Sequence, residues 1–356
     1  MDVLFIAANL NSGGAERVMS LLANQFIENG YEVGFVFLKK DIRFYPLPQN
    51  VIIKVAEKEC GSDSLIKKLL WMRKHIKQNK PDVIFAFRIA VYCATLLSLL
   101  GVKVPVIASE RNDPRFNSLA WKVIQAVLLP LAKHLVVQTQ QIKNYFPKFI
   151  QKKTTVIINP VREDVFYENA NGSSKKENRI ISVARLDSQK NQQMMIRAFA
   201  KIAEEYSDWH LVIFGEGPLR TTLESLISSL KLQGRVLLPG RTELVIDELR
   251  KSKLFCFSSD FEGLSNSMIE ALCVGLPIVT TNVSGTEDII VDGENGFIVP
   301  VNDENAMAHS LRGLMADEQL MKKMGEQNRQ KAHLFSIESI YAQWEKLIQS
   351  VVIDGN

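Results

Sequence analysis

A chain of 356 residues is long for a single domain, and its 46% hydrophobic content is enough for two ordinary cores. The formal net charge of +4 divides unevenly, because residues 1–150 hold 20 Lys and Arg against 11 Asp and Glu, whereas the remainder holds 23 against 28. The composition disfavours a membrane-spanning or nucleic-acid-binding protein. The longest mostly apolar run, residues 89–102, is shorter than the about 20 residues of a spanning helix, and the basic residues are not interleaved with aromatic ones.

Apolar runs and helical patterns alternate along the first half of the chain. Short apolar runs bounded by turn residues suit buried parallel strands, and apolar residues at every third or fourth position suit helices. In chain order, this half is predicted as strand 3–8, helix 18–28, strands 32–38 and 51–55, helix 64–79, strand 82–87, helix 89–100, strand 104–109, helix 121–132 and strands 134–138 and 155–158. Such alternation indicates a doubly wound parallel α/β sheet.

A polar stretch rich in Gly, Ser and Lys, residues 169–178, predicts a linker before a second alternating series. That series is predicted as strand 179–184, helix 192–206, strand 209–214, helix 219–230, strand 236–238, helix 245–250, strand 254–257, helix 266–274, strand 278–281, helix 287–290, strand 296–299 and helices 304–315, 317–332 and 337–351. We therefore expect two Rossmann-like domains, 1–168 and 179–335, and a C-terminal helical segment, 336–356, that packs back toward the first domain.

The turn after the first strand holds Gly13 and Gly14. Glycines in this place let the backbone approach a phosphate at a helix N-terminus. The spacing is not G-x-G-x-x-G, and the second strand ends at Lys39 and Lys40 rather than at an acidic residue that could hold a ribose, which disfavours an NAD site. A tight strand–helix turn is the alternative interpretation.

Two cations follow the first strand of the second series. Arg185 leaves the strand end, and Lys190 lies five residues further on, before a helix. An arginine fork and a lysine point charge suit a diphosphate. The alternative is a solvated turn whose charges pair locally.

Glycine turns follow the next two strands, at Gly215 and at Gly240-Arg241. Either turn could offer backbone groups to a nucleotide base. Ordinary strand–helix turns are the alternative interpretation of both.

Two carboxylates bracket the start of the predicted helix 266–274. Glu262 lies in the loop before the helix and Glu270 about one turn inside it. Between them, the N–H groups of Gly263, Leu264 and Ser265 lie at a helix N-terminus, where an anion can bind. The alternative is a cap-region carboxylate followed by a surface glutamate.

In this combination and order, the motifs resemble the retaining glycosyltransferases of family 4, among them bacterial transferases that build capsule and lipopolysaccharide. The resemblance covers nearly the whole chain and rests on Gly13-Gly14-Ala15-Glu16-Arg17, Asn159-Pro160, Arg185 with Lys190-Asn191, Gly215-Glu216-Gly217, Gly240, and Glu262 and Glu270 with Gly263-Leu264. It implies a GT-B fold, in which two tandem Rossmann-like domains face each other across a cleft that holds the ligand.

The resemblance also implies roles for these residues. Arg185 and Lys190 would neutralise the diphosphate of a nucleotide-sugar donor, with the charge on the leaving group stabilised by groups already in place. Glu270 would hold the ribose hydroxyls and Glu262 the hydroxyls of the donor sugar. The donor would also contact Gly14 with its neighbour Gly13, Gly215, the backbone near Arg241, and the N–H groups of Gly263, Leu264 and Ser265.

Metal-dependent transferases usually carry Asp-x-Asp, which this chain lacks, so neither a metal nor another cofactor is expected. Glu262 is not expected to act as a covalent nucleophile of the kind that retaining hydrolases use. The resemblance implies reaction on one face of the sugar, with the leaving phosphate taking the acceptor proton.

One motif departs from the family. Many relatives place a histidine after the fourth or fifth strand of the first domain, and none of the five histidines here fits that place. Glu110 or Arg111 stands there instead, and we expect Glu110 to belong to the catalytic set. A charged loop that closes on itself is the alternative.

The expected acceptor is a glycan or a polyprenyl-diphosphate-linked sugar. The basic, amphipathic segment 64–79, with Trp71, suits an anionic lipid surface, although a plain surface helix that covers the sheet is the alternative. The first strand begins at once, so no signal peptide is expected, and four widely spaced cysteines indicate a reducing compartment. We expect a cytoplasmic protein that is peripheral on the inner face of the plasma membrane.

The sequence thus predicts a metal-independent retaining glycosyltransferase whose donor is a UDP-hexose or UDP-N-acetylhexosamine. Two alternatives remain: a GT-B nucleotide-sugar epimerase, hydrolase or phosphorylase, and a non-catalytic subunit that binds a sugar nucleotide. A phosphorylase would normally need a pyridoxal phosphate lysine and a longer chain. A non-catalytic copy would be freer to lose Arg185, Lys190, Glu262 and Glu270.

Overall fold

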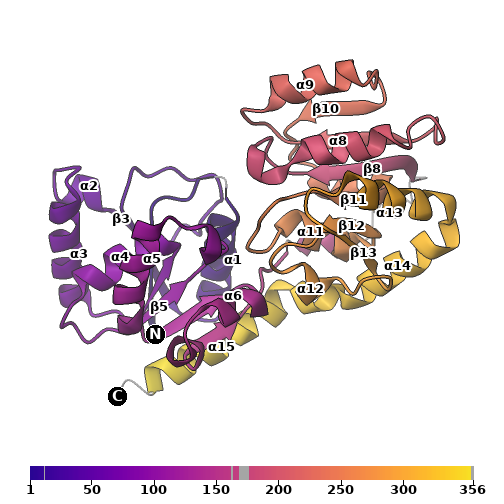
Figure 1. Cartoon of the computed structure of the whole chain (residues 1–356). Coiled ribbons are helices and arrows are strands. Elements are labelled where there is room, and N and C mark those ends of the chain that lie inside the picture. The colour runs from indigo at the N-terminus through magenta and orange to yellow at the C-terminus, as the bar shows by residue number, and fades with distance from the viewer. Residues whose placement is uncertain (12, 162, 168–175, 354–356) are drawn as a thin grey trace. The chain divides into compact units, whose positions relative to one another are not determined.

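The computed structural model describes residues 1–11, 13–161, 163–167 and 176–353 (Figure 1). The chain forms two compact units: unit 1 consists of Met1–Pro160 with Ile337–Asn356, and unit 2 of Val161–Ser336. Each unit has its own parallel sheet and its own hydrophobic core, as the alternating pattern predicts.

The sheet of unit 1 follows the order β3-β2-β1-β4-β5-β6-β7, and all of the described pairs are parallel. Its strands are β1 (Asp2–Ala7), β2 (Glu32–Phe37), β3 (Ile52–Val55), β4 (Val83–Phe87), β5 (Val106–Ser109), β6 (His134–Val137) and β7 (Thr154–Val156). The strand order reverses between β1 and β4. In doubly wound sheets, ligands bind outside the carboxyl ends of the strands at such a switch point.

The helices of unit 1 include three short ones that the sequence patterns miss, α2, α6 and α7. The described helices are α1 (Gly14–Glu28), α2 (Ala56–Glu59), α3 (Leu65–Asn79), α4 (Ile89–Ser98), α5 (Leu119–Leu128), α6 (Gln140–Tyr145), α7 (Lys148–Gln151) and α15 (Ile337–Ile353), with 3-10 turns at η1 (Pro114–Phe116) and η2 (Leu129–Leu131). A helix of one turn buries too few residues to show a 3.6-residue period, so short helices escape a search for periodicity.

Aromatic side chains dominate one face of the sheet of unit 1. The Phe5 ring stacks on Phe35 and Phe85, with centroid separations of 4.9 and 5.2 Å. The C-terminal helix α15 packs against α1 and places Trp344 edge-on to Phe85, at 5.2 Å. Trp344 is fully buried, so the last helix of the chain completes the core of the first unit.

The sheet of unit 2 follows the order β10-β9-β8-β11-β12-β13, and its described pairs are also parallel. Its strands are β8 (Glu177–Val183), β9 (His210–Phe214), β10 (Val236–Gly240), β11 (Ser252–Phe257), β12 (Ile278–Thr281) and β13 (Gly296–Val299). Its helices are α8 (Gln192–Ala200), α9 (Arg220–Ser229), α10 (Val245–Lys251), α11 (Asn266–Val274), α12 (Thr286–Ile289), α13 (Glu304–Ala316) and α14 (Glu318–Lys331), with 3-10 turns at η3 (Glu163–Val165), η4 (Ser188–Lys190) and η5 (Ala332–Phe335). The switch point lies between β8 and β11.

Some predicted bounds are wrong. The chain passes from unit 1 to unit 2 after Pro160, earlier than the expected domain end at 168, and β8 begins inside the expected linker 169–178. Most of that linker, 169–175, lies outside the described residues. The first helix begins at Gly14 rather than at 18, and α8 ends at Ala200 rather than at 206, where a series of turns follows.

Candidate active site

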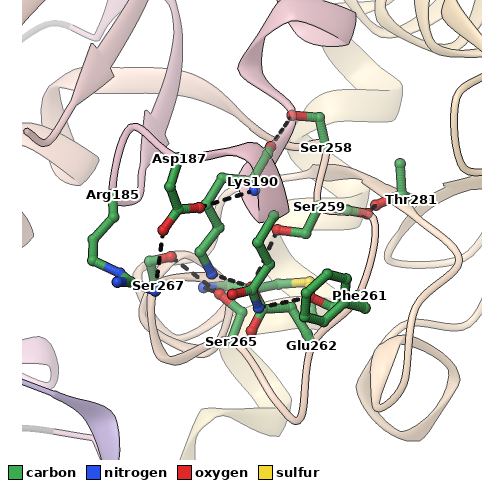
Figure 2. Close-up of polar contacts among 12 residues, drawn as sticks. Arg185, Asp187, Lys190, Ser258, Ser259, Phe261, Glu262, Ser265, Ser267 and Thr281 are labelled. Carbon is green, nitrogen blue, oxygen red and sulfur yellow. Dashed lines mark hydrogen bonds and ion pairs between the residues drawn. The ribbon is translucent and has the colours of Figure 1, made fainter. Parts of the chain in front are cut away.

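The loops that leave β8 and β11 form the candidate site, because these neighbouring strands flank the switch point of unit 2. The β8 loop carries Arg185 and Lys190 and leads into α8. The β11 loop carries Glu262 and leads into α11. Figure 2 shows the side chains of both loops turned toward one another.

Backbone and side-chain hydrogen bonds join the two loops. Asp260 N–H donates to the Gln189 carbonyl at 2.9 Å, and Ser258 Oγ donates to the Lys190 carbonyl at 2.9 Å. Gln189 Nε2 donates to the Phe261 carbonyl at 2.8 Å, and Asn191 Nδ2 donates to Asp260 Oδ1 at 2.7 Å. These bonds hold the two loops in one fixed arrangement.

Lys190 and Glu262 form an ion pair within this arrangement (Figure 2). Their side chains are only 15% and 11% exposed. Ser259 Oγ donates a second hydrogen bond to Glu262 Oε1, at 3.1 Å, and the Lys190 ammonium lies 5.3 Å from the centre of the Phe257 ring. An ammonium has three N–H donors, so Lys190 keeps donors for a further anion.

Arg185 lies at the open side of the same loop. Its side chain is 69% exposed, and Nη2 lies 3.1 Å from Asp187 Oδ2. Asp187 also caps the η4 turn, since its Oδ1 accepts from Lys190 N–H at 3.3 Å. One carboxylate therefore positions both cations, and the rest of the guanidinium faces solvent. The patterns that led to Arg185 and Lys190 did not single out Asp187, although Asp before a helix start is a capping signal.

Helix α11 begins where the sequence predicts. Ser265 is its N-cap, and Ser265 Oγ accepts from Met268 N–H at 3.4 Å. Gly263, Leu264 and Ser265, which lead into the helix, are buried. The partial positive charge of a helix N-terminus lies next to Glu262 and Lys190. Glu270 lies on the buried face of α11 and is 5% exposed.

Close packing of the backbone requires a glycine at position 215. A Cβ on Gly215 would lie 1.9 Å from the Ala184 carbonyl oxygen, so only glycine lets the end of β9 approach the end of β8. Gly215 N–H donates to the Gly240 carbonyl at 2.8 Å, and Arg241 follows with an exposed side chain. The structure thus groups Gly215, Gly240 and Arg241 at one corner of the carboxyl edge.

In unit 1, Gly13 and Gly14 start α1 at the end of β1. Gly13 is the N-cap, and a Cβ there would lie 2.2 Å from Glu16 Oε2. The nearly buried Glu16 accepts from Arg88 Nη1 at 3.1 Å. Arg88 follows β4, across the switch point of this sheet, and has a φ of 74°. No sequence pattern singles out Arg88, because a lone arginine after a strand has no motif around it.

Glu110 directly follows β5, at the carboxyl edge of the sheet where the sequence places it, but its side chain turns into unit 1. Its side chain is enclosed, with 1% exposure, and accepts hydrogen bonds from Tyr92 Oη at 2.8 Å and Gln125 Nε2 at 3.0 Å. Burial raises the pKa of this carboxyl. Tyr92 and Gln125 thus enclose the Glu110 carboxyl within unit 1, and its catalytic role stays a prediction.

Arg111, the other candidate at this place, is also buried. Its guanidinium lies 4.8 Å from the Phe87 ring and 5.7 Å from the Trp344 ring, and Nη1 donates to Asn159 Oδ1 at 2.8 Å. The pair Glu110–Arg111 thus belongs to the interior of unit 1.

In the part of the chain that the structure describes, no group of three or more His, Cys, Asp and Glu side chains could hold a metal ion. Within the same residues, every helix is too short or too polar to span a membrane.

Comparison with known proteins agrees with this architecture. Residues 12–165 match the family described as Glycosyltransferase Family 4, and residues 165–331 match Glycosyl transferases group 1. Among solved structures, Anabaena HepE in complex with UDP superposes with a TM-score of 0.83, at 16% identity, over 98% of this chain and 100% of that chain.

Two curated relatives come from Campylobacter jejuni. The chain is 31% identical, over 99% of both chains, to GalNAc-alpha-(1->4)-GalNAc-alpha-(1->3)-diNAcBac-PP-undecaprenol alpha-1,4-N-acetyl-D-galactosaminyltransferase. It is 29% identical, over 92% of this chain and 93% of the relative, to N-acetylgalactosamine-N,N'-diacetylbacillosaminyl-diphospho-undecaprenol 4-alpha-N-acetylgalactosaminyltransferase.

Two tandem doubly wound units, with charged loops at a switch point, define a glycosyltransferase of the GT-B class. The sequence matches are more specific than the fold. The chain belongs to glycosyltransferase family 4.

Proposed function

We propose that the chain transfers a hexose or N-acetylhexosamine from a UDP-linked donor to a lipid-linked or polysaccharide acceptor in surface glycan synthesis, with retention of the anomeric configuration. Both Campylobacter relatives are named for acceptors on a diphospho-undecaprenol carrier, and the HepE structure holds UDP. The Lys190–Glu262 pair carries the proposal, because it brings together at the switch point of unit 2 a cation proposed to bind phosphate and a carboxylate proposed to bind sugar hydroxyls.

Cleavage of the sugar–phosphate bond builds negative charge on the departing UDP. The Arg185 side chain is exposed, and its guanidinium pairs with Asp187. Lys190 is positioned by Glu262 and by the loop hydrogen bonds. Both cations are in place before the reaction, which is the condition under which electrostatic stabilisation lowers a barrier most. The proposal assigns to them the role that a divalent metal has in other transferases.

Glu262 is proposed to bind hydroxyls of the donor sugar. Its Oε1 is already engaged by Lys190 and Ser259, which suits a carboxylate that orients a polar substrate rather than one that attacks carbon. In the proposed reaction the acceptor oxygen attacks the anomeric carbon on the face that UDP leaves, and the departing phosphate takes the acceptor proton. Glu270 is proposed to hold the ribose, and Gly215 and Arg241 to meet the base.

We also propose that the protein works at the inner face of the plasma membrane as a peripheral protein. The support is chemical: a polyprenyl carrier lies in the bilayer, and the first 150 residues carry an excess of Lys and Arg that is attracted to anionic lipid.

A thermal-shift panel tests the donor. UDP-glucose, UDP-galactose, UDP-N-acetylglucosamine and UDP-N-acetylgalactosamine are compared with GDP-mannose and ADP-glucose, each in EDTA and in Mg²⁺. Stabilisation grows with the logarithm of ligand concentration over its Kd, so one UDP sugar should raise Tm most, equally with and without metal. A shift seen only with GDP or ADP sugars, or only with Mg²⁺, would refute the proposal.

A further inference from the structure

A groove of about 600 Å³ lies in unit 1, on the side of the sheet covered by α3, α4 and α5. Its walls are mainly apolar and include Leu69 of α3, Ala94 and Leu97 of α4, and Ile124 and Leu128 of α5. These helices lie side by side in Figure 1, with α4 between the other two. The volume is within the ~300–1,000 Å³ range of small-molecule sites, and the candidate active site does not use it.

One end of the groove is charged. Lys39 and Lys40 are exposed there, and Lys68 pairs with Asp63 and, at 3.6 Å, with Glu57. Three ammonium groups face two carboxylates, which leaves one net positive charge on the rim. The groove is therefore amphipathic along its length, with a cationic end and an apolar body.

The charged end opens at the carboxyl edge of the sheet. Asn9 follows β1, Lys39 and Lys40 follow β2, and Ala90 follows β4 by three residues. This is the edge at which Gly13 and Gly14 start α1 and at which doubly wound folds bind substrates. A ligand that filled the groove would thus present its polar end at the substrate-binding edge of unit 1.

Helix α5, which forms one wall, exposes its apolar residues. Leu119, Val123 and Val127 are 76%, 56% and 67% exposed, whereas the buried residue of α5 is Gln125, which bonds to Glu110. An outward apolar face beside an apolar groove is uncommon on a protein surrounded only by water. The exposed apolar face of α5 fits a groove wall that lies against hydrocarbon.

We propose that this groove binds the prenyl chain of a lipid-linked acceptor, with the apolar walls along the chain and its phosphate or diphosphate next to Lys39 and Lys40. The assignment rests on the proposed function, since it deepens the acceptor class named there. The concave shape selects a single chain, and the cationic end selects an anionic head. Prenyl phosphates combine both features.

The experiment measures binding to the full chain by calorimetry, below the micelle concentration of each probe. The probes are geranyl monophosphate, geranylgeranyl monophosphate, geranylgeraniol and inorganic diphosphate. Each buried methylene strengthens binding roughly fourfold, so the geranylgeranyl probe should bind at least 100-fold more tightly than the geranyl one. Loss of the phosphate should weaken binding about tenfold through Lys39 and Lys40, and inorganic diphosphate should bind far more weakly than either phosphate ester.

Two groove variants and one matched control test whether the prenyl chain lies in the groove. Ala94→Phe fills the groove, and Leu97→Ser removes apolar wall at a position that is 45% exposed, where folding is not at risk. Both should weaken the geranylgeranyl probe at least tenfold. Ala126→Phe adds the same bulk on the exposed face of α5, outside the groove lining, and should leave binding unchanged. Equal affinity for both chain lengths, or loss caused by Ala126→Phe but not by the groove variants, would overturn the assignment.

The UDP thermal shift, measured on the same preparations, separates this inference from the proposed function. If UDP raises Tm but the affinity for prenyl phosphates does not depend on chain length, the groove assignment is overturned and the proposed transferase function stands. If the affinity for prenyl phosphates depends on chain length but UDP does not raise Tm, the proposed UDP donor is overturned and the groove stands as a prenyl phosphate site.

Discussion

At the scale of single residues, the candidate site depends on two carboxylates that hold its two cations. Asp187 holds Arg185 at 3.1 Å and accepts from Lys190 N–H, whereas Glu262 pairs with the Lys190 ammonium. Such pairing holds both cations in position before a diphosphate arrives. Because the cations are paired, replacement of either one also leaves a carboxylate without its ion-pair partner.

Lys190→Ala should lower kcat by about 10²–10³-fold, because it removes one preorganised charge from the leaving group. Steady-state transfer from the UDP sugar found in the panel measures the loss. Lys201→Ala is the matched control, since Lys201 pairs with Glu304 at 3.8 Å, away from these loops, and should retain wild-type kcat. Equal loss of kcat in both variants, or no loss in Lys190→Ala, would remove Lys190 from the site.

His134 should make stability dependent on pH. Burial, followed by the charges of Lys153 and Lys143, lowers the pKa of His134 to about 4. The unfolded chain takes up this proton near pH 6.5, so the unfolded state binds more protons between pH 6.5 and 4, and the free energy of unfolding falls as pH falls through this window. Urea unfolding at pH 7, 5.5 and 4.5 should show the decline, and His134→Gln should flatten it. A decline of the same size in the variant would assign the effect to other groups.

At the scale of elements, α11 and α5 differ in which residues they bury. Helix α11 is buried along most of its length and presents its N-cap, Ser265, to the candidate site. Helix α5 buries Gln125 and exposes its apolar residues. Both helices match the predicted segments closely, so periodicity locates a helix better than it identifies the face that packs.

The C-terminal helix α15 offers an element-scale test. Trp344→Ala should destabilise unit 1 by about 3–5 kcal/mol, because it removes a fully buried aromatic side chain from the Phe85 cluster. Trp344→Phe should cost less, since the indole Nε1 has no hydrogen-bond partner among the described residues and loses nothing polar. Gln343→Ala, on the exposed side of the same helix, is the control. Chemical denaturation measures all three, and equal costs for Trp344→Ala and Gln343→Ala would contradict the packing.

At the scale of the whole molecule, the chain leaves unit 1 after Pro160 and returns to it at Ile337. Unit 2 is thus a continuous stretch of chain, whereas the core of unit 1 needs residues from both ends of the sequence. Ile340, Trp344 and Ile348 of α15 are fully buried in that core. The integrity of unit 1 therefore depends on a helix that follows the whole of unit 2 along the chain.

Truncation after Ser336 should unfold unit 1 selectively. The removed helix uncovers Phe5 and Phe85, whereas the sheet and core of unit 2 keep all their strands and helices. Calorimetry should show loss of one transition, and the remaining transition should still shift with UDP, because the proposed donor residues Arg185, Lys190, Glu262 and Glu270 lie in unit 2. Retention of the full-length melting profile, or loss of the UDP shift with unit 2 still folded, would contradict this division.

The sequence by itself determined the two doubly wound sheets, the helix 266–274 and the order of charged loops that marks the family. These features are readable because apolar runs, caps and glycine turns act over a few neighbouring residues. The family resemblance and the GT-B architecture are confirmed. The roles of Arg185, Lys190, Glu262 and Glu270 remain predictions.

Only the tertiary structure decided which charged residues are buried and which face of each helix packs. Glu110 is as polar in sequence as Glu262, yet Tyr92 and Gln125 enclose the first, whereas Lys190 pairs with the second in a loop that follows β11. The Glu16–Arg88 pair and the outward apolar face of α5 likewise depend on which strands become neighbours. Burial is set by contacts between residues distant in sequence, which no local pattern contains.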